Sequence, residues 1–172
     1  MKVSGMISSY FDRWLSKGRA LERVWKVREE LVQFLEDTDS DESRSHLALL
    51  LSEDASMDLA FLVDIMRHMN DLNVKLQGEK KDVGQMWLAV KGFVAKLNVF
   101  HQDITESKDH FPTLRRFIEQ QVEHDMAQAA CKKAEKFIGD LQNEFLQRFA
   151  TCKKIDSVID LITVPRAADK EK

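Results

Sequence analysis

The side chains that could carry out chemistry are scattered along this sequence rather than gathered in a motif. None of the five histidines has a second histidine four residues away with an acid between them, the spacing of a helical zinc site. Neither Cys131 nor Cys152 begins a C-x-x-C or C-x-x-H pair, and there is no glycine-rich phosphate loop. The sequence therefore predicts no catalytic residue, no metal site, no cofactor and no small-molecule substrate. The histidines are His46, His68, His101, His110 and His124.

Asp64 is unusual among the carboxylates because it lies inside an apolar run, FLVDIM. A carboxylate in such a place must reach solvent, pair with a cation or belong to a site. We favour a structural ion pair with a lysine or arginine of the next helix. A two-metal carboxylate cluster would need more inward-facing acids than the predicted helices supply. His68 and His101 lie beside apolar stripes, where we expect core or boundary imidazoles.

Basic residues near an aromatic ring form a candidate contact to nucleic acid. Arg13, Lys17 and Arg19 surround Trp14, and such a group can hold a phosphate backbone while the ring stacks on a base. Ordinary solubilising charge beside a buried tryptophan is the alternative. The net charge of -3, from 26 basic and 29 acidic residues, argues against a duplex-binding surface built on overall charge.

The elements that must position these side chains are predicted to be helices. A chain of 172 residues with 44% apolar content suits one domain, and six glycines with two prolines leave few breaks for a sheet. No run of eighteen apolar residues and no signal peptide is present, so we expect a soluble intracellular protein with free cysteines. The predicted fold is all-α, an antiparallel bundle of about five to six helices with one long C-terminal helix or helix pair.

Apolar spacing places the first helix at residues 19–36. The following EDTDSDES is predicted to be an exposed acidic loop. The short run LALLL, residues 47–51, fits an L-x-x-L-L docking box, but core packing is the preferred interpretation.

The strongest periodicity lies in LAFLVDIMRHMNDLNVKLQG, residues 59–78, and in residues 83–104. Apolar residues recur at alternating spacings of three and four, which predicts two helices packed along each other. The intervening GEKKD is predicted to be the turn of an antiparallel hairpin. The predicted seam between helices consists of Leu59, Leu62, Met66, Met69, Asn73, Leu76, Val90, Phe93 and Leu97.

After Pro112, which suits a first helical turn, residues 114–149 are predicted to be helical with a break around residues 131–136. The expected organisation is a lead-in over residues 1–16, one helical domain over 17–163 and a disordered tail over 164–172.

The motifs RWLS-G, LAFL-D, LN--LQG and HFPTL occur in an order that resembles the hAT superfamily of DNA transposases. The resemblance covers residues 11–150 and is closest to domesticated vertebrate proteins that carry a BED or SCAN zinc-finger region. In that family a ribonuclease-H-like catalytic domain is interrupted by a large all-α insertion. This chain looks like the insertion, and no residue in it matches one of the three catalytic carboxylates.

The resemblance implies a non-catalytic, transposase-derived helical domain that serves protein or DNA interaction. It also implies that the amide at Asn73 is scaffold, because an asparagine in a seam selects the register of two helices. A helical adaptor or oligomerisation module without a nucleic-acid role is the alternative function. We expect a protein partner or a homo-oligomer, DNA as a second candidate partner, no membrane, and a nuclear rather than cytoplasmic location.

Overall fold

A computed structural model describes residues 16–38, 40–77 and 83–150, and every regular element within these ranges is a helix. The predicted all-α fold is therefore confirmed. The elements in chain order are a helix over residues 16–26, α2 (Arg28–Asp37), α3 (Asp41–Leu51), α4 (Glu53–Leu76), α5 (Val83–Asp103), α6 (Pro112–Gln121) and α7 (His124–Arg148).

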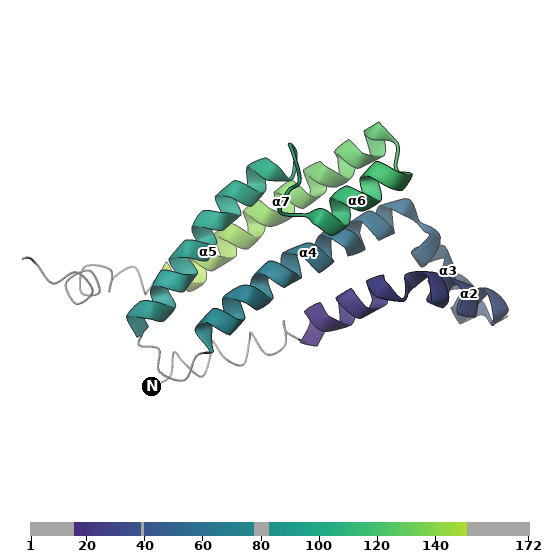
Figure 1. Ribbon diagram of the computed structural model, residues 1–172, viewed down its shortest axis with the longest axis horizontal. Coiled ribbons are helices and arrows are strands. Elements are labelled where there is room, and N and C mark those ends of the chain that lie inside the picture. Colours follow the sequence, from purple (N-terminus) through teal and green to yellow (C-terminus); the bar gives the residue numbers. More distant parts are fainter. Residues whose placement is uncertain (1–15, 39, 78–82, 151–172) are drawn as a thin grey trace, which may run out of the picture.

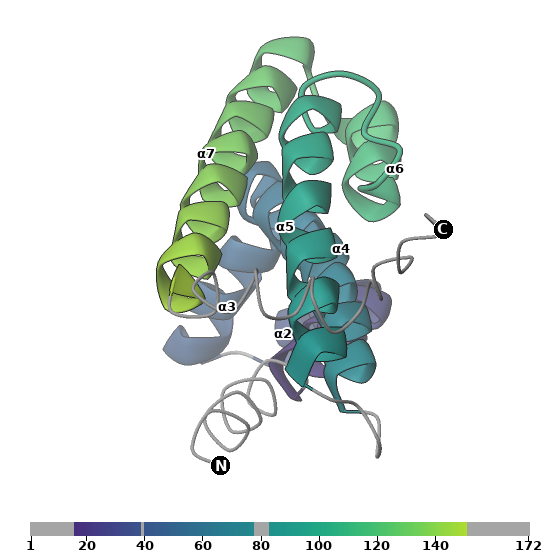
Figure 2. The ribbon, with the colours of Figure 1, turned by 90° about the vertical axis from the view of Figure 1, so that its left-hand side faces the viewer.

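The three longest helices, α4, α5 and α7, lie side by side and contact one another, as both views show (Figures 1 and 2). Helix α4 begins where Ser52 accepts a hydrogen bond from the backbone N–H of Ala55 at 3.3 Å, and Glu53 and Asp54 favour its first turn. The long apolar stripes of α4 and α5 then pack together, because 24 and 21 helical residues give each helix a long buried face.

The core lies among α4, α5, α6 and α7. Burying such side chains contributes roughly 1.5–3 kcal/mol each, so these contacts dominate the stability of the bundle. The largest apolar side chains that are almost completely buried are Met57, Ile65, Leu97, Phe100, Ile104, Phe111, Leu114 and Ile138.

The C-terminal part is a helix pair, but the break lies elsewhere than expected. Helix α6 ends at Gln121, Val122 is extended, and α7 runs without interruption through residues 131–136. The prediction of a break there is wrong because the thin apolar patch is a close helix contact. Small side chains let α7 approach its neighbours closely, and those buried are Ala127, Ala130, Cys131 and Ala134.

The predicted first helix is interrupted at Val27, which separates residues 16–26 from α2. Gly18 of the first segment lies against α4, since a Cβ built there would stand 2.8 Å from Asn70 Nδ2 and 3.3 Å from Met66 Cβ. The same segment reaches α6 through Trp25, whose ring meets the ring of Phe117 edge-on at a centroid distance of 5.7 Å.

The acidic stretch predicted to be a loop is mostly helical. Glu36 and Asp37 end α2, while Ser40 begins α3 by accepting a hydrogen bond from the backbone N–H of Ser43 at 3.1 Å. Asp41 and Glu42 occupy the first turn of α3, where negative charge is favourable. The prediction failed because acidic residues after a capping serine start a helix as readily as they extend a loop.

Helices α2 and α3 form a hairpin at one end of α4 (Figure 1), and α3 contacts α4. The preference for core packing of residues 47–51 is wrong, because Leu49 and Leu51 are 61% and 59% exposed. Among the described helices, none is both long enough and apolar enough to cross a membrane.

Candidate interaction site

The α2–α3 hairpin exposes large apolar side chains. Phe34 of α2 is 63% exposed, comparable with Leu49 and Leu51 of α3. No residue of α2 is buried, and the buried residue of α3 is Ser43. We call Phe34, Leu49 and Leu51 the hairpin surface. Leu49 and Leu51 are two positions apart and so point to different sides of α3, but large exposed apolar side chains on both helices of the hairpin make it a candidate contact with a partner.

The hairpin is also acidic. Residues 28–37 and 41–51 carry six acidic side chains against two arginines, which gives a formal charge of -4. Arg28 is directed back at the bundle, with its guanidinium carbon 4.3 Å from the centre of the Trp25 ring. Arg44 pairs with Asp41 at 3.1 Å. The six acids are Glu29, Glu30, Glu36, Asp37, Asp41 and Glu42.

The helix over residues 16–26 has the opposite charge. Its four basic residues and one glutamate give a formal charge of +3, and Lys17 and Arg19 are exposed on either side of the buried Gly18. Lys26 pairs with Glu22 at 3.0 Å. The other two predicted nucleic-acid contacts, Arg13 and Trp14, lie outside the described residues. The basic residues are Lys17, Arg19, Arg23 and Lys26.

Asp64 does not form the predicted ion pair with the next helix. One of its oxygens accepts hydrogen bonds from the backbone N–H groups of Thr113 and Leu114, at 2.8 and 3.1 Å, and so caps α6. Its other oxygen pairs at 3.1 Å with Arg67 on its own helix. Burial raises the pKa of the Asp64 carboxyl above its usual value, while the hydrogen bonds from Thr113 and Leu114 oppose that rise.

Asp103 organises the loop that leads into α6, which the sequence did not reveal. Its carboxylate accepts hydrogen bonds from Ser107 Oγ at 2.6 Å and from the backbone N–H groups of Asp109 and His110 at 3.0 and 2.8 Å. His110 Nδ1 lies 3.0 Å from the same carboxylate. Burial works against the charge, but the hydrogen bonds outweigh it and lower the pKa of Asp103 to about 2.

His68 and His101, the two histidines predicted beside apolar stripes, are both half-buried. His68 donates from Nε2 to the carbonyl oxygen of His110 at 2.8 Å, and its ring stands 4.4 Å from that of Phe100. Burial lowers the pKa of His68, which favours the neutral ring. His101 is partly exposed and lies 3.5 Å from Glu135. Within residues 16–38, 40–77 and 83–150, no group of three or more His, Cys, Asp or Glu side chains could hold a metal ion.

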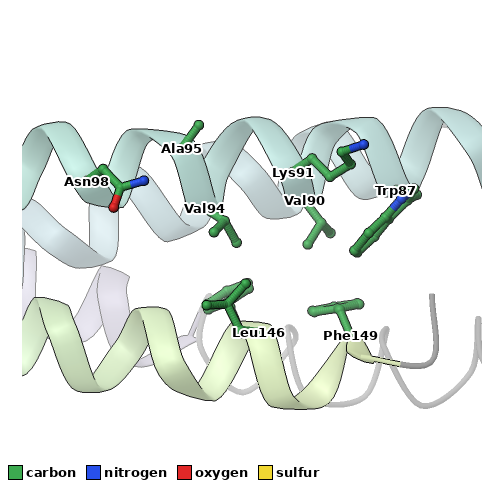
Figure 3. A pocket seen from close by; sticks show the side chains of 9 residues that line it. Trp87, Val90, Lys91, Val94, Ala95, Asn98, Leu146 and Phe149 are labelled. Atoms are coloured by element: carbon green, nitrogen blue, oxygen red, sulfur yellow. The ribbon is translucent and has the colours of Figure 1, made fainter. Parts of the chain in front are cut away.

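A groove of about 290 Å³ lies between α5 and α7. Figure 3 shows Trp87, Val90 and Val94 of α5 pointing toward Leu146 of α7 and Phe149, the residue that follows α7. The ring centroids of Trp87 and Phe149 are 6.1 Å apart, so this groove is the outer edge of the contact between the two helices. Its polar lining residues are Lys91 and Asn98, and Asn98 Oδ1 accepts a hydrogen bond from Gln142 Nε2 at 2.7 Å.

The residues of the predicted seam lie on α4 and α5. Most of them are buried, while Leu59 and Leu62 are half-buried. Asn73 is 2% exposed, and its Nδ2 has no hydrogen-bond partner among the described residues. The buried members are Met66, Met69, Asn73, Leu76, Val90, Phe93 and Leu97.

An all-α bundle with an exposed hairpin defines the chain as a helical domain, and comparison with known proteins identifies its family. The FAM200/GTF2IRD2 helical domain family matches residues 2–105, and the chain belongs to this family. It is 33% identical over 154 residues to "General transcription factor II-I repeat domain-containing protein 2" of Bos taurus and 31% identical over 154 residues to the protein of that name in Mus musculus. Each alignment covers 89% of this chain and 15% of the relative, so the chain spans a small part of the curated relatives it matches. No solved structure matches it.

Proposed function

We propose that this chain is a non-catalytic, transposase-derived helical domain that binds a macromolecular partner in the nucleus. The observation that carries the proposal is the hairpin surface, where Phe34, Leu49 and Leu51 are each more than half exposed. Exposed apolar area of this kind is stabilised when a partner covers it. The two relatives are named as transcription factor repeat domain-containing proteins, which supports a nuclear role.

The buried carboxylates support a role without chemistry. Asp64 holds the N-terminus of α6 and Asp103 holds the loop before it, each through backbone N–H groups. A carboxylate engaged in this way contributes to the fold and is not free to act on a substrate. The resemblance to the helical insertion of hAT transposases, which lies apart from that family's catalytic acids, agrees with this.

Site-specific photocrosslinking tests the proposal. A benzophenone side chain is placed at residue 34 or 49 of the full chain, or at residue 74 as a matched control, because Val74 of α4 is 67% exposed but lies outside the hairpin. We expect discrete crosslinked products in cells from residues 34 and 49 and a much weaker yield from residue 74. Equal yields at all three sites, or none at 34 and 49, would contradict an interaction through the hairpin.

DNA binding is a second candidate function, favoured by the charge of +3 on the helix over residues 16–26. Lys17 and Arg19 would contact phosphates, with Arg13 and Trp14 as further contacts proposed from the sequence. Each phosphate contact releases counterions, so binding must weaken steeply as salt rises.

Electrophoretic mobility with a short duplex across a salt series tests this second function. We expect Lys17→Glu with Arg19→Glu to weaken binding and reduce its dependence on salt. The control is Lys132→Glu with Lys136→Glu, since both lysines are exposed on α7. An equal effect of both double variants, or no binding at low salt, would contradict DNA contact by this helix.

A further inference from the structure

We infer that the hairpin surface binds a basic, amphipathic α-helix of another protein. This inference rests on the proposed function, because it names the class of partner for the same surface. It is carried by the exposure of the hairpin's apolar side chains and by the negative charge of the hairpin.

The first step concerns the shape of the partner. Helices α2 and α3 carry eight large apolar residues from Leu31 onward, and every one of them is half-buried or exposed. Two helices leave such a set only partly covered. Leu49 and Leu51 point to different sides of α3, so a third helix laid along one face of the hairpin would cover part of the set and form a small bundle. The eight residues are Leu31, Val32, Phe34, Leu35, Leu47, Leu49, Leu50 and Leu51.

The second step concerns the charge of the partner. The hairpin carries a formal charge of -4, and the two arginines that oppose its acids are already engaged, Arg28 with the Trp25 ring and Arg44 with Asp41. Lysines and arginines flanking an apolar stripe would therefore be attracted to it, and this attraction would speed association and decrease with salt.

The same charge disfavours other occupants. A second copy docking through the same hairpin would place acid against acid, and phosphate groups of a duplex or an anionic membrane would be repelled. A second copy of this chain that docks its basic helix, residues 16–26, on the hairpin is the competing occupant. The test must distinguish it from a basic helix of another protein.

The test uses the full chain and two fluorescein-labelled 18-residue helical peptides with identical leucine stripes. One peptide has lysines on its polar face and the other has glutamates. We expect saturable fluorescence anisotropy with the Leu/Lys peptide, at least tenfold weaker binding of the Leu/Glu peptide, and weaker Leu/Lys binding as salt rises.

Variants locate the binding. Phe34→Ala with Leu49→Ala should weaken Leu/Lys binding at least tenfold, while Val74→Ala, matched in exposure, should leave it unchanged. Glu29→Gln with Glu30→Gln should weaken binding and reduce its dependence on salt. All these side chains are exposed, so each variant should stay folded. Circular dichroism checks this.

Three results would overturn the inference: equal binding of the two peptides, equal loss in Val74→Ala, or no binding of the Leu/Lys peptide. A fourth would be self-association in sedimentation velocity that Phe34→Ala with Leu49→Ala abolishes, because the occupant would then be a second copy. Crosslinking from residue 34 in cells distinguishes a failure of this inference from a failure of the proposed function. If crosslinks form but the peptide fails, the partner chemistry is wrong and the proposed function stands; if both fail, both are wrong.

Discussion

Asp64 on α4 accepts a hydrogen bond from the backbone N–H of Thr113 on α6 at 2.8 Å, across 49 positions of sequence. Helix α6 begins after Phe111, whose side chain provides no cap, so the carboxylate of α4 supplies what the local sequence lacks. This contact fixes the short helix against the bundle and gives a buried carboxylate a structural purpose.

Replacing Asp64 with alanine should therefore destabilise the protein. Two backbone N–H groups of α6 would lose their acceptor, which costs about 2 kcal/mol for a buried cap. Urea unfolding followed by circular dichroism measures the loss. Asp64→Asn should cost less because an amide oxygen can still accept a hydrogen bond, and Asp71→Ala, at an exposed position of α4, is the control. Equal stability of Asp64→Ala and Asp71→Ala would rule out the capping role.

Asp103 should make stability depend on pH. Its pKa is lowered in the folded protein from an ordinary 3.8 to about 2, so its contribution is fully present above pH 3.8 and is lost as pH falls toward 2. Asp103→Asn cannot titrate, and its stability deficit relative to the wild type should shrink over that range. Urea midpoints of the two proteins at pH 6, 4, 3 and 2.5 measure this deficit. A deficit that stays constant with pH would show that Asp103 does not cause the pH dependence.

Two helical glycines should respond oppositely to alanine. Gly92 of α5 has nothing within 4 Å of an added Cβ, so Gly92→Ala should raise stability by roughly 0.5–1 kcal/mol. At Gly18 the same methyl group would meet Asn70 and Met66, and overpacking of about 1–3 kcal/mol should exceed the gain in helix propensity. Thermal unfolding compares the two variants. A Gly18→Ala protein as stable as Gly92→Ala would show that residues 16–26 do not pack tightly on α4.

Asn73 should lower stability while keeping the helices in one arrangement. Its buried Nδ2 has no partner among the described residues, so Asn73→Leu should raise the free energy of unfolding by about 1–2 kcal/mol. If the amide also selects the register, the variant should show broadened or doubled NMR amide peaks. A drop in stability would mean that the amide makes a favourable contact.

The long helices could be predicted from sequence because their apolar residues repeat over many turns. The periodicity over residues 59–78 and 83–104 corresponds to α4 and α5, and Pro112 begins α6 as its fixed backbone angle favours. Patterns within one helix were sufficient for these elements.

The errors arose where a long-range contact or a weak local signal decides the structure. The partner of Asp64 lies 49 residues away, although a helix start at Pro112 without a capping side chain was a usable clue. The exposure of Leu49 and Leu51 depends on how few elements cover α3, which apolar spacing does not encode. Small buried residues such as Ala130 resemble a gap in the pattern, yet they mark close helix packing.

Hydrogen exchange of the full chain with and without the Leu/Lys peptide tests most directly whether the α2–α3 hairpin is the interaction surface. Amides of α2 and α3 should exchange faster than those of α4 and α5 in the free chain, because no apolar side chain of the hairpin is buried. Bound peptide should slow exchange in α2 and α3 and leave the α5–α7 groove unchanged. Slower exchange at the groove, with none at the hairpin, would contradict the assignment.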